Sequence, residues 1–218
     1  MSSQPTYIFD FDSTLVRVEA LDELADIALV GDADHAQKLQ RIREITQLGM
    51  EGSMSIEESL RMRLQLLAIR QEMLPPLVAR LRQSFTASVW RGRERLATMR
   101  DHVWVVSSGF HEWIEPTIET LGLRADHVLA NRLRSREDGV MEMDPTSTCA
   151  VDAGKALVIE RCNLPRPRMM IGDGMTDWRV REHGACEKFI CFTEVVRRDA
   201  VVARADAVAS TLEQVLEL

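Results

Sequence analysis

Short apolar runs rich in β-branched and aromatic residues alternate with longer helical patterns along most of this 218-residue chain. This alternation is typical of βαβ units, and it constrains the chain to an α/β fold with a parallel sheet. We therefore expect a doubly wound, Rossmann-like core. The predicted strands are Tyr7–Phe11, His102–Val106, His127–Ala130, Arg168–Ile171, Lys188–Cys191 and Ala207–Val208. The predicted crossover helices are Phe110–Leu121, Ala153–Arg161, Thr176–Glu182 and Glu194–Ala203.

One segment interrupts the alternation, because residues 16–89 contain helical patterns only. This predicts an inserted helical cap domain of residues 16–89 after the first strand, with residues 1–15 and 90–218 forming the core. The polar stretch 130–148, which contains Asp138-Gly139, predicts either a hairpin or a solvated connection. Three helices are expected in the insertion: one capped by Asp34 and ending at Gly49, one opened by a Ser55–Glu58 capping box and running to Ile69, and one from Pro75 to Gln83.

Composition excludes several classes of partner. The 27 Lys and Arg residues against 34 Asp and Glu residues give a net charge of −7, which argues against nucleic acid or an anionic membrane surface as a partner. The apolar runs are too short to span a membrane, and Met1–Thr6 lacks the apolar region of a signal peptide. Four cysteines without a Cys-x-x-Cys pair predict reduced, mostly structural thiols and no zinc site. We expect a cytoplasmic monomer or homodimer.

A first pair of acidic residues, Asp10 and Asp12, follows the first predicted strand. On an extended strand the two carboxylates would project to the same face. Two buried like charges are costly unless a cation compensates them, and a divalent cation with oxygen ligands is the natural candidate. The alternative for Asp12 alone is a helix or turn cap, which leaves Asp10 unexplained.

A second acidic pair, Asp173 and Asp177, follows another apolar strand within Gly172-Asp173-Gly174-Met175-Thr176-Asp177. Carboxyl ends of parallel strands meet at one crevice, so the two pairs are expected to converge there around a metal ion. The glycines would permit a close approach of the main chain. Taken alone, this Gly-Asp-Gly sequence is also compatible with an ordinary turn.

Two further features belong to the same predicted crevice. Ser107-Ser108-Gly109 lies at a strand-to-helix turn, where hydroxyl and N–H groups can bind an anion, although the same residues suit a helix N-cap. Lys155 lies near a helix start and is placed either to reach a phosphate or to remain a solvated surface residue.

The order of these features resembles the haloacid dehalogenase superfamily of phosphohydrolases, whose motifs are Asp-x-Asp-x-Thr/Val, a Ser or Thr, a Lys, and an acidic Gly-Asp-Gly-x-x-Asp. The resemblance implies that Asp10 is a nucleophile and Asp12 a general acid and base. It also implies that Ser107 and Lys155 neutralise phosphoryl oxygens. The implied cofactor is Mg²⁺, held by Asp10, Asp12 (through its main-chain carbonyl), Asp173 and Asp177.

Secondary motifs lie at Phe9–Val16 with Glu19 and Leu21–Glu23, then at Met50–Gly52, Ser59–Arg63 and Ala130–Leu133. They are similar to those of phosphoserine phosphatases, which implies a role in serine biosynthesis with a small phosphorylated metabolite as substrate. In that family Glu19 would bind the substrate's ammonium group and Arg63 its carboxylate. Ser108, Gly109 and Thr176 would also line the substrate site.

Arg63 also stands out from the residues alone, because it falls on one helical stripe with Ile56, Leu60 and Leu67. A guanidinium in an apolar stripe needs a carboxylate, supplied either by Glu19 or another cap acid or by a substrate. Glu19 itself would otherwise be a solvated acid at a helix start.

The sequence departs from the phosphoserine phosphatase pattern at Ser108, Ile56 and Thr176. Two other functions therefore stay open. The first is a related small-molecule phosphatase or a phosphotransferase, and the second, remote one is a receiver-like signalling module. Receivers lack a helical insertion after the first strand and a proton-transferring Asp two residues after the nucleophile.

Overall fold

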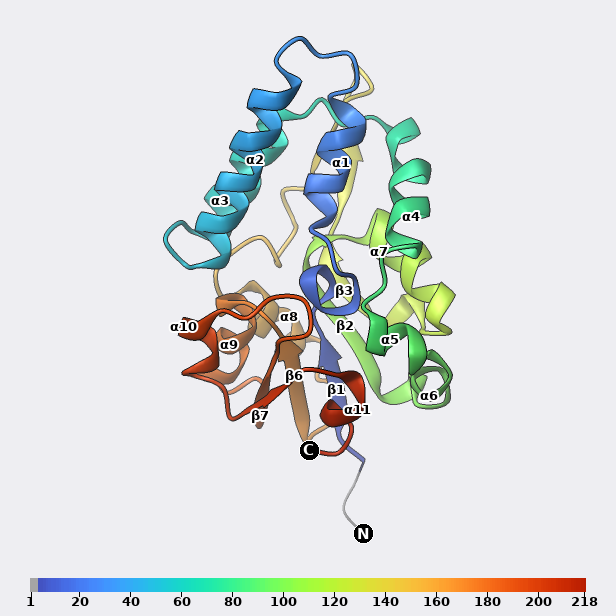
Figure 1. Ribbon diagram of the computed structural model, residues 1–218, viewed down its shortest axis with the longest axis vertical. Helices are drawn as coiled ribbons and strands as arrows, with labels where there is room; N and C mark the ends of the chain where they lie inside the picture. Colours follow the sequence, from blue (N-terminus) through green and yellow to red (C-terminus); the bar gives the residue numbers. More distant parts are fainter. Residues whose placement is uncertain (1–3) are drawn as a thin grey trace.

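The computed structural model describes residues 4–218 (Figure 1). Its central feature is a six-stranded, all-parallel sheet with the strand order β3-β2-β1-β6-β7-β8. The predicted α/β class with a doubly wound parallel sheet is confirmed. The predicted N-terminal segment lies partly outside the described residues, since these begin at Gln4. The strands are β1 (Thr6–Phe9), β2 (Val103–Phe110), β3 (Val128–Asn131), β6 (Arg168–Gly172), β7 (Lys188–Phe192) and β8 (Ala207–Ala209).

Helices cover both faces of this sheet because the apolar side chains of each strand point alternately to one face and the other. In β1, Tyr7 and Phe9 belong to one buried cluster and Ile8 to another. The cluster of Ile8 is completed by α8 (Gly154–Arg161), α9 (Met175–Glu182) and α10 (Asp199–Val202). On the other face lie α5 (Ala87–Arg91), α6 (Arg93–Thr98), α7 (His111–Ile118) and α11 (Leu212–Val215). Short 3₁₀ turns occupy Gln71–Met73, Arg100–His102, Glu119–Leu121 and Ala125–His127.

Four helices stand beyond the carboxyl ends of the strands (Figure 1). Two neighbouring segments of the chain connect them to the sheet. Arg17 N donates to Ser84 O (2.8 Å), and Thr86 N donates to Leu15 O (3.0 Å). The division into domains at residues 16 and 89 stays a prediction. The helices are α1 (Ala20–Ala28), α2 (His35–Met50), α3 (Ile56–Leu66) and α4 (Leu74–Arg82).

The expected helix end at Gly49 is wrong, because α2 continues through Met50. A Cβ at Gly49 would lie 2.8 Å from Ser59 Oγ, so this glycine allows α2 and α3 to approach closely. The left-handed residue after the helix is Gly52, with φ +78°. The Ser55 cap on α3 is confirmed, since its side chain accepts the N–H of Glu58 (3.2 Å).

The expected hairpin within 130–148 is confirmed as β4 (Leu133–Ser135) paired antiparallel with β5 (Met141–Met143). Its tip contacts the segment between α3 and α4. Met141 N donates to Ile69 O (2.8 Å), and Arg70 forms a bridge with Val140. The hairpin therefore ties the helical segment to the core at a second place.

Three element boundaries differ from the prediction in ways that affect the site. The strand predicted to end at Val106 continues to Phe110 as β2. The first strand ends at Phe9, so Asp10 and Asp12 do not share one face of an extended strand. The helix predicted at Glu194–Ala203 is reduced to α10, and residues 194–198 form a loop. Glu194 is held by Ser88, whose main-chain N donates to its carboxylate (3.0 Å). This tertiary contact outcompetes the local helical preference.

Within residues 4–218, no helix is both long and apolar enough to cross a bilayer. The four cysteines are free thiols, of which Cys149, Cys186 and Cys191 are buried. Burial raises the pKa of these three thiols, which makes them poor nucleophiles.

Candidate active site

The chain turns sharply after β1. Residues Phe11–Leu15 form a single wide turn that is not regular helix, since Asp12 is extended (ψ 142°) and Ser13 adopts a left-handed conformation (φ 51°). Val16 N closes the turn onto Phe11 O (3.1 Å). This turn separates the two carboxylates, so that Asp10 and Asp12 contact different groups.

Asp10, Asp173 and Asp177 form a buried acidic cluster, in which one carboxylate oxygen from each lies within 4.8 Å of the others. Lys155 is 3% exposed, and its Nζ lies 2.8 Å from Asp10 Oδ1 and 2.6 Å from Asp177 Oδ1. The surface alternative for Lys155 is therefore wrong. The predicted convergence of the two acidic pairs holds for these three aspartates.

The three aspartates carry more negative charge than Lys155 and Arg198, which pairs with Asp173, can neutralise. Burial and the charge of Asp177 raise the pKa of Asp10 to about 7, while burial is the main cause that raises the pKa of Asp173 well above its ordinary value. Asp173 Oδ2 is buried and lacks a hydrogen-bond partner within the described residues, although Arg198 Nη1 lies 3.2 Å away. Buried carboxylate oxygens are the ligands that Mg²⁺ prefers, so the residues present fit a divalent cation.

Gly172 is required by this cluster. A Cβ at Gly172 would lie 2.2 Å from Asp177 Oδ2, a distance that no packing tolerates. Gly174 differs, because a Cβ there would meet its nearest neighbour, the same oxygen, at an ordinary 3.5 Å. The expected close approach therefore applies to Gly172 and not to Gly174, whose N–H instead donates to Asp177 Oδ2 (3.0 Å).

The Asp12 carboxylate lies outside the acidic cluster. Its Oδ1 accepts the main-chain N–H of Ala20 (2.9 Å), the first residue of α1. The capping contact that the sequence left open for Asp12 is thus present, and a metal contact through its main-chain carbonyl stays a prediction. Burial, together with the charges of Glu19 and Asp10, raises the pKa of Asp12 well above its ordinary value. This favours the protonated form, which a general acid requires.

Ser107, Ser108 and Gly109 lie near the carboxyl end of β2. Ser107 is 1% exposed, and its Oγ accepts the N–H of Gly109 (2.9 Å). All three residues line a small inner cavity that Asp10 and Lys155 also line. The alternative in which these residues only begin a helix is wrong, because β2 runs through Phe110 and α7 starts at His111.

Arg63 and Glu19 reach the same inner cavity from the helical segment. Arg63 is 4% exposed, and its guanidinium donates to Ser59 O and to Thr46 Oγ1, both at 3.3 Å. Within residues 4–218 no carboxylate lies within 4.0 Å of it. Glu19 is half-buried at the start of α1 and accepts the hydroxyl of Ser13 (2.7 Å).

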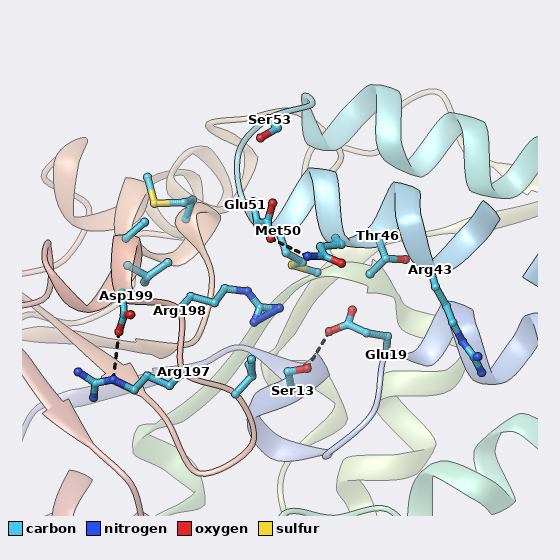
Figure 2. A pocket seen from close by; sticks show the side chains of 15 residues that line it. Ser13, Glu19, Arg43, Thr46, Met50, Glu51, Ser53, Arg197, Arg198 and Asp199 are labelled. Carbon is cyan, nitrogen blue, oxygen red and sulfur yellow. Dashed lines mark hydrogen bonds and ion pairs between the residues drawn. The ribbon is translucent and has the colours of Figure 1, made fainter. Parts of the chain in front are cut away.

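A larger cleft of about 750 Å³ adjoins the inner cavity and shares Glu19 and Met50 with it (Figure 2). It lies between α2 and the loop that precedes α10. In Figure 2, Arg198 extends from this loop into the cleft. The remaining predicted residue, Thr176, lines the inner cavity together with Asp12.

The site combines buried carboxylates, a buried lysine and a serine hydroxyl at the carboxyl ends of β1, β2 and β6. The sequence profile of the haloacid dehalogenase-like hydrolases matches residues 7–180, which include all of these groups. The chain belongs to this family. Within it, the chain is similar to phosphoserine phosphatases.

Relatives and solved structures support this placement in the haloacid dehalogenase-like family. The chain is 33% identical over 206 residues to the chloroplastic phosphoserine phosphatase of Arabidopsis thaliana, covering 91% of this chain and 66% of the plant protein. It is 32% identical over 173 residues to human phosphoserine phosphatase, covering 78% of this chain and 73% of the human protein.

Among solved structures, a phosphoserine phosphohydrolase-like protein from Francisella tularensis superposes with a TM-score of 0.86 at 26% identity, over 98% of this chain and 99% of that one. A structure described as a phospho-aspartyl intermediate analogue of phosphoserine phosphatase gives a TM-score of 0.77 at 26% identity, with 99% of each chain covered.

Sequence reasoning missed Arg198, which faces Asp173 and lines the larger cleft. Its predicted position inside a long helix hid it. Two adjacent arginines, Arg197 and Arg198, in the segment that follows the predicted strand Lys188–Cys191 were the available signal, because loops at the carboxyl ends of the strands form the crevice in such sheets.

Proposed function

We propose that this protein hydrolyses O-phospho-L-serine to serine and phosphate with Mg²⁺ as cofactor, through a phosphoaspartyl intermediate on Asp10. The observation that carries the substrate assignment is Arg63, a buried guanidinium that faces the inner cavity without a carboxylate partner in the described part of the chain. A buried cation without a partner is costly. A substrate carboxylate in the inner cavity would supply that partner.

Glu19, whose charge is opposite to that of Arg63, supports the same substrate class. It lines the inner cavity and is held in place by the hydroxyl of Ser13. An amino acid phosphate offers an ammonium group to Glu19, a carboxylate to Arg63 and a phosphoryl group to Asp10. A phosphomonoester without the amine and the carboxylate would leave both side chains without a partner of opposite charge.

In the first half of the reaction, Asp10 attacks phosphorus. The contacts of Lys155 and of the Phe11 N–H are both to Asp10 Oδ1, which leaves Oδ2 as the attacking oxygen. The new Oδ2–P bond forms as the bond between phosphorus and the serine oxygen breaks. Asp12, whose raised pKa keeps its proton available, donates that proton to the departing alkoxide.

In the second half, water attacks the phosphorus of the phosphoaspartyl group. Asp12, now ionised, accepts the proton of this water. The Oδ2–P bond breaks, phosphate leaves, and the Asp10 carboxylate and the protonated Asp12 are restored. The Ser107 hydroxyl and the Lys155 ammonium stabilise the phosphoryl oxygens in both halves.

The side chains of Asp10, Asp173 and Asp177 would hold Mg²⁺, together with the main-chain carbonyl that the family resemblance assigns to Asp12. When bound, the cation supplies positive charge that reduces repulsion between the phosphoryl oxygens and these carboxylates. We further propose that residues 16–89 act as a cap domain that places Glu19 and Arg63 over the phosphoryl site and excludes water from it.

A panel of phosphomonoesters tests the proposal. With Mg²⁺, we expect phosphoserine to be hydrolysed far better than phosphoethanolamine, which lacks the carboxylate, or phosphoglycolate, which lacks the amine. Ca²⁺ prefers more ligands at longer distances and should support turnover poorly, and excess EDTA should abolish it. Equal rates for all three esters would replace the serine assignment with a broader phosphatase, and undiminished hydrolysis in EDTA would refute the metal requirement.

Two variants test the assigned roles. Asp10→Asn should abolish turnover, because an amide is a poor nucleophile. Asp12→Asn should lower kcat by roughly 10²–10⁴-fold, the usual contribution of general acid–base catalysis. Full activity of Asp10→Asn would exclude the covalent route.

A further inference from the structure

The strand β2 departs from regular pairing where it contributes to the site. Val106 is paired with Leu129 of β3 and Phe110 with Asn131. Three residues, Ser107–Gly109, therefore lie opposite a single residue, Ala130. Such a bulge disturbs the hydrogen bonds of the sheet ladder and redirects side chains. Here it directs Ser107, Ser108 and Gly109 toward the inner cavity.

Two side chains satisfy main-chain groups at this bulge. Asn131 Nδ2 donates to the carbonyl of Ser108 (2.8 Å). On the other strand, the N–H of Ala130 is 3.2 Å from His111 Nε2. Because a main-chain N–H can only donate, Nε2 must be the acceptor and the ring proton lies on Nδ1. Nδ1 lies 2.6 Å from Glu115 Oε1, which holds this tautomer.

The surroundings leave the bulge little freedom. Asn131 is fully buried, His111 is 8% exposed, and the N–H of Gly109 is fixed on Ser107 Oγ. A Cβ at Gly109 would lie 3.2 Å from both Ser107 Oγ and Ile114 Cδ1. Neither Asn131 nor His111 lines the inner cavity, so they act on the site only through the bulge.

We propose that Asn131 and His111 are positioning residues that hold Ser107–Gly109 in the shape in which the Ser107 hydroxyl faces the phosphoryl group. The inference rests on the proposed function for the identity of that group. Without the Asn131 donor, the half-buried Ser108 carbonyl loses its hydrogen-bond partner, which is costly enough to shift the local equilibrium toward other loop shapes. Loss of the His111 acceptor has the same effect on the Ala130 N–H.

Asn131→Leu removes the donor at similar side-chain volume and is the main test. Thr6→Val is the matched control, because it removes a bond of the same kind, from the buried Thr6 hydroxyl to the carbonyl of Pro165 (2.8 Å), at the amino end of β1. We expect hydrogen exchange of the Gly109 amide to accelerate about tenfold in Asn131→Leu and to stay unchanged in the control. Equal exchange at Gly109 in the two variants would overturn the positioning role.

Kinetics give a second readout with the Mg²⁺-loaded enzyme and phosphoserine. A misplaced Ser107 weakens contacts that are strongest in the transition state, so kcat should fall about tenfold or more while KM changes little. His111→Phe should show the same loss, and His111→Gln, which keeps an acceptor, should recover most of it. Loss of activity in His111→Gln equal to that in His111→Phe would exclude the acceptor role.

The two proposals fail separately. If the wild-type protein hydrolyses no phosphomonoester, the proposed function fails, while faster exchange of Gly109 in Asn131→Leu still supports the control of the bulge. If the wild type is active and both exchange and kcat in Asn131→Leu match those of Thr6→Val, the positioning role fails and the proposed function stands.

Discussion

Replacement of Arg63 by methionine separates substrate recognition from fold stability. At most two groups of the guanidinium are engaged, Nε with Ser59 O and Nη1 with Thr46 Oγ1, both at a long 3.3 Å. Since a guanidinium carries about five N–H donors, most of the fork is available to a substrate carboxylate. Methionine preserves the apolar stem and removes the charge.

The expected magnitudes follow from this geometry. Loss of one partner of a buried, hydrogen-bonded charge pair costs ~2–5 kcal/mol. At about 1.4 kcal/mol per factor of ten, kcat/KM for phosphoserine should fall by roughly 30-fold to several thousand-fold. The free energy of unfolding should stay within ~1 kcal/mol of the wild-type value or rise, because a buried cation without a carboxylate partner is itself unfavourable.

The assay compares kcat/KM for phosphoserine and phosphoethanolamine with urea unfolding of the same preparations. Arg61→Met is the control, since Arg61 lies exposed on the same helix and, among residues 4–218, donates only to Gln65. Phosphoethanolamine has no carboxylate, so its kcat/KM should change less than ~3-fold in Arg63→Met. Equal losses for both substrates, or a loss matched by instability, would show that Arg63 serves the fold and not the substrate.

Further substitutions test the acidic cluster and the electrostatics of the helical segment. Gly172→Ala should displace Asp177 and abolish Mg²⁺ binding measured by calorimetry, whereas Gly174→Ala, with ordinary space for a Cβ, should bind Mg²⁺ within ~3-fold of the wild type. Burial and the charge of Glu19 raise the pKa of Asp22 to about 6 from 3.8. The folded state therefore binds the Asp22 proton more tightly than the unfolded state does. The stability that this proton contributes is fully present below about pH 4 and is lost as the pH rises through about 6. Between pH 4 and pH 8 the wild type should therefore lose ~2–3 kcal/mol of unfolding free energy that Asp22→Asn retains, as measured by urea unfolding. An equal pH dependence of stability in the two proteins would contradict the raised pKa.

The sequence predicted the strands and most crossover helices because their apolar periodicity reports burial directly. It also predicted which polar residues meet, since the carboxyl ends of parallel strands converge. Asp10, Ser107, Lys155 and Asp173 accordingly lie together in the structure. Arg63 was indicated by a single charge within an apolar helical stripe.

The sequence did not predict features that depend on tertiary contacts or on unusual backbone conformation. The turn at Asp12 relies on a left-handed Ser13, a conformation that serine rarely adopts. The loop with Arg198 forms because Glu194 binds Ser88, which is 106 residues away in the chain. The bulge of β2 becomes apparent only from its register with β3.

Detection of a phosphoryl group on Asp10 tests the central claim most directly. Asp12→Asn lacks the base for the second half of the reaction, and p-nitrophenyl phosphate has a leaving group that needs no general acid in the first half. Rapid acid quench of this variant with this substrate and Mg²⁺, followed by peptide mass spectrometry, should show one phosphoryl group on the peptide that contains Asp10, and Asp10→Asn should show none. Steady release of p-nitrophenol without any phosphorylated peptide, or a phosphoryl group on another residue, would contradict the mechanism.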